Sequence, residues 1–155
     1  MTTADPAKGS QRLESTGTIT YTAGSQTQTL YNVVGGKVWL VYAGHRILAA
    51  WGSTGIKDMQ FRVEESSATT NISDNEAVES AGAGSWFVID GTTASTGLFV
   101  ATQEVGQSSS ATAGNFVLNE GTTVQVVTAG PRTGSGRAHF SVIPLTPGAR
   151  LEPQL

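Results

Sequence analysis

Apolar and polar residues alternate along much of the chain with the two-residue period of β-strands. The stretch from Ile56 to Glu64 shows this best, because Met59, Phe61 and Val63 alternate with charged or amide side chains. One face of such a strand points into the protein and the other to water. The stretch from Lys37 to Ala43 differs, since apolar residues occupy both of its alternating sets. That pattern predicts a strand buried on both faces.

Similar segments recur at intervals of about 8–12 residues and are separated by Gly, Ser, Thr, Asn and Pro. They are residues 17–22, 26–34, 45–51, 85–90, 97–103, 115–119, 122–128 and 134–144. Residues 65–84 lack a period and predict a long loop with at most one short strand or turn. No amphipathic helix is evident. We therefore expect an all-β protein, an antiparallel β-sandwich or jelly roll of about eight to ten short strands.

Two glycine-containing dipeptides predict tight turns of the chain. Gly35 and Gly36 separate the segments 26–34 and 37–43, and glycine readily adopts the positive φ of a two-residue hairpin turn. We expect these two segments to form a β-hairpin around Gly35 and Gly36. The sequence Glu120-Gly121 predicts a second tight turn between the later strands. The β-sandwich should span residues 17–145, with an extended N-terminal arm (1–16) and an extended C-terminal tail (146–155).

Composition narrows the function classes. The 155 residues are enough for one domain, only 14% of them are charged, and there is no cysteine for a disulfide or a thiolate metal site. Nine Lys and Arg against twelve Asp and Glu give a net charge of −3, which disfavours nucleic acid as a partner. No apolar run is long enough to span a bilayer, so we expect no membrane association.

The residues that could carry chemistry do not form a recognisable site. His45 and His139, without cysteine, are too few for a zinc site, and the serine nucleophile pattern G-x-S-x-G is absent. The carboxylates at Glu64-Glu65 and around Asp74 fit solvent-exposed positions better than a facing catalytic pair. We expect no enzyme activity, no catalytic residue, no metal and no cofactor. Trp39, Trp51 and Trp86 lie in apolar runs, which favours core packing over a sugar platform.

Four short motifs resemble a known family of viral proteins. They are T-L-Y-N-V-V-G-G-K-V from Thr29, G-S-W-F-V-I-D-G-T-T from Gly84, E-G-T-T-V-Q-V-V from Glu120 and H-F-S-V-I-P-L from His139. Their order is similar to that of the head decoration (cement) proteins of tailed bacteriophages, over about residues 27–145. The resemblance implies a homotrimeric β-sandwich on the outer capsid surface of the virion. There it would bridge neighbouring major capsid proteins and stabilise the shell.

The terminal segments are the expected attachment points, because an extended arm can add a strand to a neighbouring sheet. The N-terminal residues expected to bind the capsid are Thr2, Thr3, Asp5, Pro6, Lys8, Gln11 and Arg12. Residues 144–155 come second. One alternative stays open: a receptor- or carbohydrate-binding module of a phage fibre or appendage, which would bind through an exposed aromatic such as Trp51 or Trp86.

Overall fold

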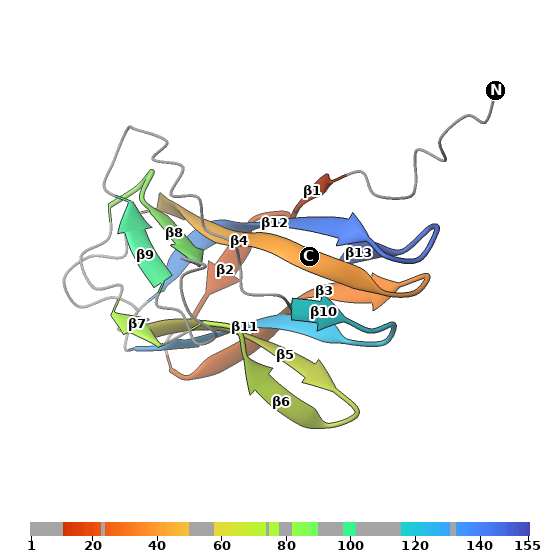
Figure 1. Ribbon diagram of the computed structural model, residues 1–155. Helices are drawn as coiled ribbons and strands as arrows, with labels where there is room; N and C mark the ends of the chain where they lie inside the picture. The colour runs from red at the N-terminus through yellow and green to blue at the C-terminus, as the bar shows by residue number, and fades with distance from the viewer. Residues whose placement is uncertain are drawn as a thin grey trace.

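The computed structural model describes residues 11–22, 24–49, 58–73, 75–77, 82–89, 98–101, 116–130 and 133–155. In this part of the chain thirteen strands form two antiparallel sheets, here called sheet A and sheet B, and no helix occurs (Figure 1). The prediction of an all-β antiparallel sandwich is confirmed. Several strands have only two to four residues, which is why the described chain divides into more strands than the sequence pattern suggests.

The strand orders of the two sheets interleave distant parts of the sequence. Sheet A runs β1 (Arg12–Ser15), β12 (Gly134–Pro144), β4 (Val38–Ala49), β8 (Trp86–Ile89) and β9 (Leu98–Ala101), with β2 (Ile19–Tyr21) paired to β12 and β10 (Phe116–Leu118) paired to β4. Sheet B runs β13 (Arg150–Pro153), β3 (Gln26–Val34), β11 (Thr123–Ala129), β5 (Asp58–Glu65) and β6 (Ala68–Asn71), with β7 (Glu76–Ala77) paired to β5.

The core lies between the two sheets. Phe140 of sheet A contacts Tyr31 and Phe61 of sheet B, with ring centroids 5.2 Å apart in both pairs. Such tilted and edge-on pairs add to the burial of apolar area. Met59, Phe61 and Val63 are all buried, so the inward face predicted from their alternation is confirmed.

The prediction of a hairpin at Gly35 and Gly36 is wrong. Both glycines have the expected positive φ, 76° and 122°. However, β3 lies in sheet B and β4 in sheet A, so the turn carries the chain from one sheet to the other. The turn between β10 and β11, which contains Gly121, also crosses between the sheets. Positive φ specifies a sharp reversal, but the hydrogen-bond partners of the flanking strands decide whether it becomes a hairpin.

Three crossings between the sheets gather at one end of the sandwich, on the right of Figure 1. They connect β3 to β4, β10 to β11 and β12 to β13. Lys37 O accepts a hydrogen bond from Leu145 N (2.9 Å), and Lys37 N donates to Thr146 Oγ1 (3.1 Å). Gly121 N donates to Val33 O (3.0 Å), which links the turn between β10 and β11 to the end of β3. The three turns therefore form one hydrogen-bonded unit, here called the crossing end.

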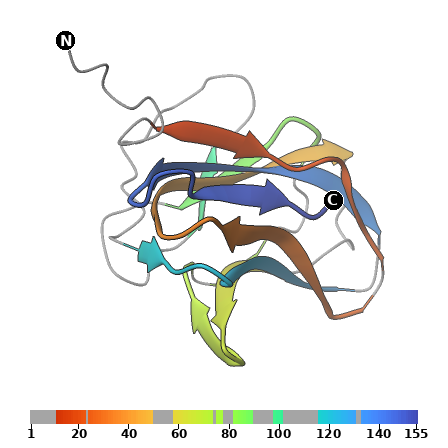
Figure 2. The ribbon, with the colours of Figure 1, turned by 90° about the vertical axis from the view of Figure 1, so that its right-hand side faces the viewer.

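The sheets extend beyond the expected domain boundaries at residues 17 and 145. β1 pairs with β12 from Arg12 opposite Val142, and β13 pairs with β3 from Arg150 opposite Val34. Figure 2 shows β1 and β13 on the same side of the sandwich. Tyr31 Oη donates to Glu14 O (2.9 Å) there, so a sheet B residue holds β1. The tail is extended as expected, but its backbone is paired, because both sheets offer an open edge on this side.

The segment expected to be a long loop, residues 65–84, begins with the turn and the second strand of a β-hairpin. β5 and β6 are joined by Ser66 and Ser67, whose φ angles are 50° and 68°. Two consecutive positive φ angles are typical of the tight turn that suits the twist of a hairpin. This turn has no clear sequence signal, because the usual Asn and Gly are absent and serine rarely takes this conformation.

Substitutions at two glycines test the packing of the crossing end. A Cβ at Gly35 would lie 2.8 Å from Gly148 O, whereas a Cβ at Gly121, where φ is also positive, meets nothing within 4 Å. Gly121→Ala should therefore lower the unfolding free energy by about 1 kcal/mol from backbone strain alone. Gly35→Ala should lower it by about 3 kcal/mol, because a backbone contact adds to the strain. Urea unfolding of both variants measures the difference, and equal losses would contradict the packing.

Candidate interaction face

The structure describes two of the seven residues expected to bind the capsid. Thr2, Thr3, Asp5, Pro6 and Lys8 lie outside the described residues. Gln11 Nε2 donates to Ser141 Oγ (2.7 Å), and Arg12 is the first residue of β1, so both belong to the edge of sheet A. They are held by the sandwich and do not form a detached arm.

His45 is a structural residue of the core. Its Nε2 lies 2.6 Å from Tyr21 Oη, and both side chains are fully buried. Burial, with a smaller effect of nearby His139, lowers the pKa of His45 to about 3, so its imidazole is neutral near pH 7. Gly136 of β12 makes room for the ring, because a Cβ at that position would overlap the imidazole. The packing interpretation therefore accounts for this histidine.

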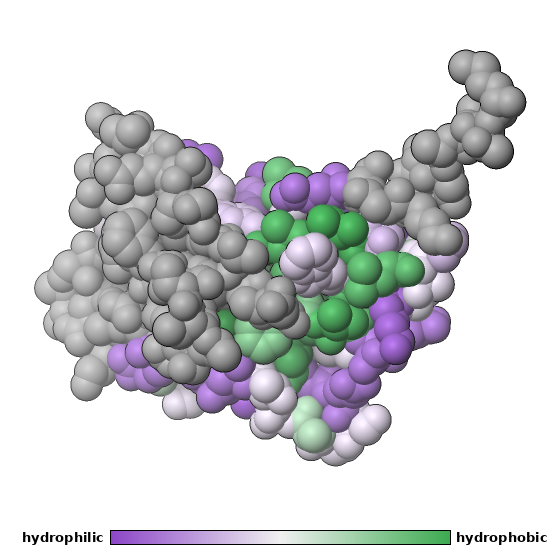
Figure 3. Space-filling view, in the orientation of Figure 1, coloured by the Kyte–Doolittle hydropathy of each residue, from purple (hydrophilic) through white to green (hydrophobic). Residues whose placement is uncertain are grey.

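The outer face of sheet A carries an apolar surface near the crossing end. Val38, Leu40, Leu118 and Val142 point into the core, so the residues between them point outward. Five of these outward-pointing residues are apolar and are here called the apolar half of the face: Leu13, Trp39, Val41, Val117 and Ile143. Val117 is 50% exposed and Leu13 66% exposed. Figure 3 shows apolar surface gathered over β4, β10 and β12.

The expectations for β4 and for two tryptophans are therefore wrong. Trp39 and Trp86 are half-buried on the outer face and take no part in the core between the sheets, while Trp51 lies outside the described residues. β4 was expected to be buried on both faces, but sheet B covers only one of them. In the part of the chain that the structure describes, no strand or turn covers the other.

The far end of the same face carries a row of cationic and aromatic side chains. Arg137 of β12 lies directly opposite Arg46 of β4, and Arg46 lies directly opposite Trp86 of β8. These three residues are called the arginine row. The Arg46 guanidinium carbon is 5.9 Å from the centre of the Trp86 ring, within the range of a cation–π contact.

His139 completes this end of the face. Its ring centre is 4.9 Å from that of Trp86, and its Nδ1 lies 2.7 Å from Ser15 Oγ. Burial, and then the charges of Arg137 and Arg46, lower the pKa of His139. The imidazole is therefore mainly neutral at pH 7, and the positive charge of this surface comes from the two arginines.

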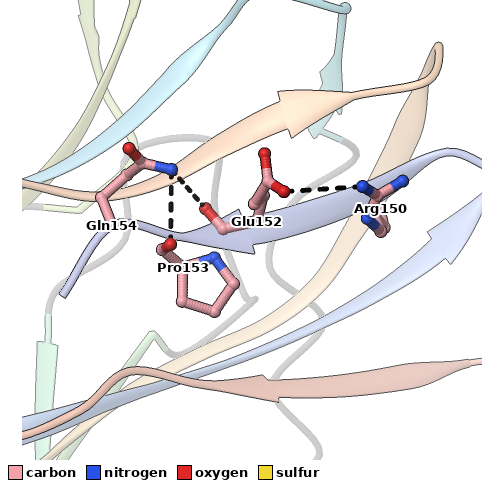
Figure 4. Close-up of polar contacts among 4 residues, drawn as sticks. All are labelled: Arg150, Glu152, Pro153 and Gln154. Carbon is pink, nitrogen blue, oxygen red and sulfur yellow. Dashed lines mark hydrogen bonds and ion pairs between the residues drawn. The ribbon is translucent and has the colours of Figure 1, made fainter.

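The outer face of sheet B is different, because both of its arginines, Arg62 and Arg150, have polar or acidic partners. Gln125 accepts a hydrogen bond from Arg62 Nε (2.7 Å) and donates to Glu64 Oε2 (2.8 Å). On β13, Arg150 lies 3.5 Å from Glu152, as Figure 4 shows. Within the described ranges, neither Arg46 nor Arg137 makes an ion pair. The uncompensated charge and the apolar half thus lie on one face of the sandwich.

The described residues hold no cluster of three or more His, Asp or Glu side chains that could bind a metal ion. Nor do they form a helix of the length and apolarity that crossing a bilayer requires. The chain matches no family model, no curated protein and no solved structure. The resemblance to head decoration proteins stays a prediction.

The buried His45 makes a testable contribution to the pH dependence of stability. Its pKa is about 3 in the folded protein and 6.5 in an unfolded chain, so below pH 6.5 only the unfolded state gains a proton. The stabilisation is complete above pH 6.5 and falls as the pH drops toward 3. Between pH 7.5 and pH 5.5 His45 should account for a loss of about 1.4 kcal/mol of unfolding free energy.

Urea unfolding at the two pH values measures this loss. A His139→Gln variant should keep most of the loss, because it leaves His45 in place, whereas His45→Gln should abolish most of it. An unfolding free energy of His139→Gln that is equal at both pH values would contradict the assignment.

Proposed function

We propose that this protein is a capsid decoration (cement) protein of a tailed bacteriophage. In this role it acts as a homotrimer on the outer surface of the head and bridges neighbouring major capsid proteins, which stabilises the shell. The observation that carries the proposal is the apolar half of the outer face of sheet A. A surface of this kind suits a protein that works by contact between folded surfaces, and the order of the sequence motifs supports the same class.

The apolar half fits contacts between copies of the chain. Permanent subunit interfaces are more apolar than interfaces that form and dissociate. The apolar half covers four neighbouring strands, roughly 14 Å at a spacing of about 4.8 Å per strand. A patch of this width can form the apolar centre of an interface, which typically buries about 800 Å² on each partner and has polar residues at its rim.

A trimer explains how modest contacts hold a small protein on a large shell. Once one subunit has bound, the other two meet their sites at a high effective concentration, so the trimer binds far more tightly than one chain. Each subunit then links the capsid protein beneath it to the capsid proteins beneath the other two.

Two charge insertions at equally exposed apolar residues test the role of the apolar half. Val117 is 50% exposed on the outer face of sheet A, and Leu155 is 51% exposed at the chain end. Val117→Glu should convert the trimer to a monomer, because a carboxylate would be buried in the interface. Light scattering measures the mass, and sedimentation with undecorated heads measures binding, which should fall by more than about tenfold with the loss of avidity. Leu155→Glu should keep the trimer mass of the wild type, and a trimeric Val117→Glu variant would rule out this interface.

The N-terminal residues can be tested separately from the sandwich. Deletion of residues 1–10 leaves β1 in place, so the melting temperature should stay within about 2 °C of the wild type. We expect lower occupancy of undecorated heads, because the deletion removes Thr2, Thr3, Asp5, Pro6 and Lys8, the arm residues expected to contact the capsid protein. Deletion of residues 1–16 should also lower the melting temperature, since the hydrogen bond from Thr16 N to Ala138 O is lost. Full head occupancy after deletion of residues 1–10 would reject a role for the arm.

One observation favours a carbohydrate-binding module of a phage appendage as a second candidate. Trp86 lies on the outer face beside Arg46 and His139, a mixture of aromatic and polar groups that sugar sites also use. Titration of tryptophan fluorescence against a glycan panel distinguishes the two functions. A saturable change that disappears in a Trp86→Phe variant would favour the carbohydrate-binding module.

A further inference from the structure

We propose that the arginine row of Arg137, Arg46 and Trp86 is the site at which an acidic surface of the capsid protein docks, through Asp or Glu carboxylates. This inference rests on the proposed function and assigns a second role to the same face. The apolar half would hold copies of the chain together, and the arginine row would hold the trimer to its partner.

The register of β4 and β12 places the two arginines side by side. Side chains directly opposite in an antiparallel pair have their Cβ atoms about 4.5–5.5 Å apart, and like charges at this distance destabilise the sheet. Arg137 and Arg46 occupy such a pair, and both are exposed on the outer face. No carboxylate among the described residues pairs with either of them. A carboxylate from outside that binds both guanidinium groups would remove their repulsion and form strong, charge-assisted hydrogen bonds.

Neighbouring side chains hold Arg46 and Trp86 of the row in place. Trp86 lies against Arg46 on one side and against His139 on another, and Ser15 hydrogen-bonds His139. These contacts restrict the Arg46 side chain before a partner arrives, which lowers the entropy lost on binding. The lowered pKa of His139 keeps a third positive charge away from the row at pH 7.

The surroundings favour a protein partner over an acidic polysaccharide or nucleic acid. Arg and Trp are enriched among the residues that dominate protein–protein binding. The row is on a sheet face that continues into the apolar half, with Arg137 and Ile143 about 20 Å apart along β12. This separation leaves room for two different contacts on one face. Two arginines on a chain of net charge −3 are too few to neutralise a run of phosphates.

Binding to poly-L-glutamate tests the row without the capsid protein. The full-length chain should bind labelled poly-L-glutamate at low salt, and 0.15 M salt should weaken the binding by screening. Arg46→Gln and Arg137→Gln should each weaken it about tenfold. The control is Arg150→Gln, which removes the same charge from the ion pair with Glu152 and should change the affinity less than about twofold. Equal effects of the three variants would overturn the proposal, as would tighter binding of polygalacturonate than of poly-L-glutamate.

A measurement of stability shows whether the row has a structural role instead. Arg137→Glu places an opposite charge beside Arg46, so the melting temperature should rise by roughly 2 °C. The same variant should lose poly-L-glutamate binding. A lower melting temperature for both Arg137→Glu and Arg46→Gln would show that the arginines stabilise the sheet, and would overturn the proposal.

Undecorated heads then separate this inference from the proposed function. Arg46→Gln should keep the trimer mass in light scattering and occupy fewer sites on the heads. If the wild type binds and Arg46→Gln binds equally well, the docking site is wrong while the proposed function stands. If the wild type itself does not bind heads but does bind poly-L-glutamate, the proposed function is wrong, and the row binds acidic surfaces of another partner.

Discussion

The structure depends on the antiparallel pairing of β4 with β12, which have twelve and eleven residues. β1 and β2 attach to β12, whereas β8 and β10 attach to β4, so this pair organises sheet A. Two of the three turns at the crossing end begin or finish in the same two strands. The inner face of the pair supplies Phe140 to the core, and its outer face carries both the apolar half and the arginine row. Stability and the proposed binding therefore rest on one set of backbone hydrogen bonds.

A bulge in this pairing decides which side chains reach the outer face. The register shifts between Ser141 and Val142, where β4 contributes one more residue than β12. An extra residue reverses the alternation of the strand. Leu40 points inward before the bulge and His45 points inward after it, so Arg46 faces outward beside Trp86. Without the bulge Arg46 would point into the core, and burying an unpaired charge there would strongly destabilise the fold.

The sequence pattern correctly predicted features that depend on residues close together in the chain. It failed for features that depend on which distant strands pair with each other. The alternation in β5 correctly identified its buried side chains, because one face of that strand is apolar and the other is not. Gly35 and Gly36 correctly indicated positive φ, but the identity of the paired strands is set by β11, β12 and β13, far along the chain. Trp39 and Trp86 were expected in the core because an apolar run does not reveal that only one face of a sheet is covered. The arginine row was missed because it exists only once the register of β4 and β12 is known.

The contrast between the two outer faces also orients the protein in the proposed assembly. On sheet B, Gln125 hydrogen-bonds both Arg62 and Glu64. A partner that bound these side chains would have to replace hydrogen bonds that already exist. Displacing such bonds gains little, because each is exchanged for another of similar strength. On sheet A, contact with a partner removes apolar surface from water, and a partner carboxylate would pair with Arg46 and Arg137, so both terms favour binding. Sheet A should therefore face the neighbouring copies and the shell, and sheet B should face the solvent.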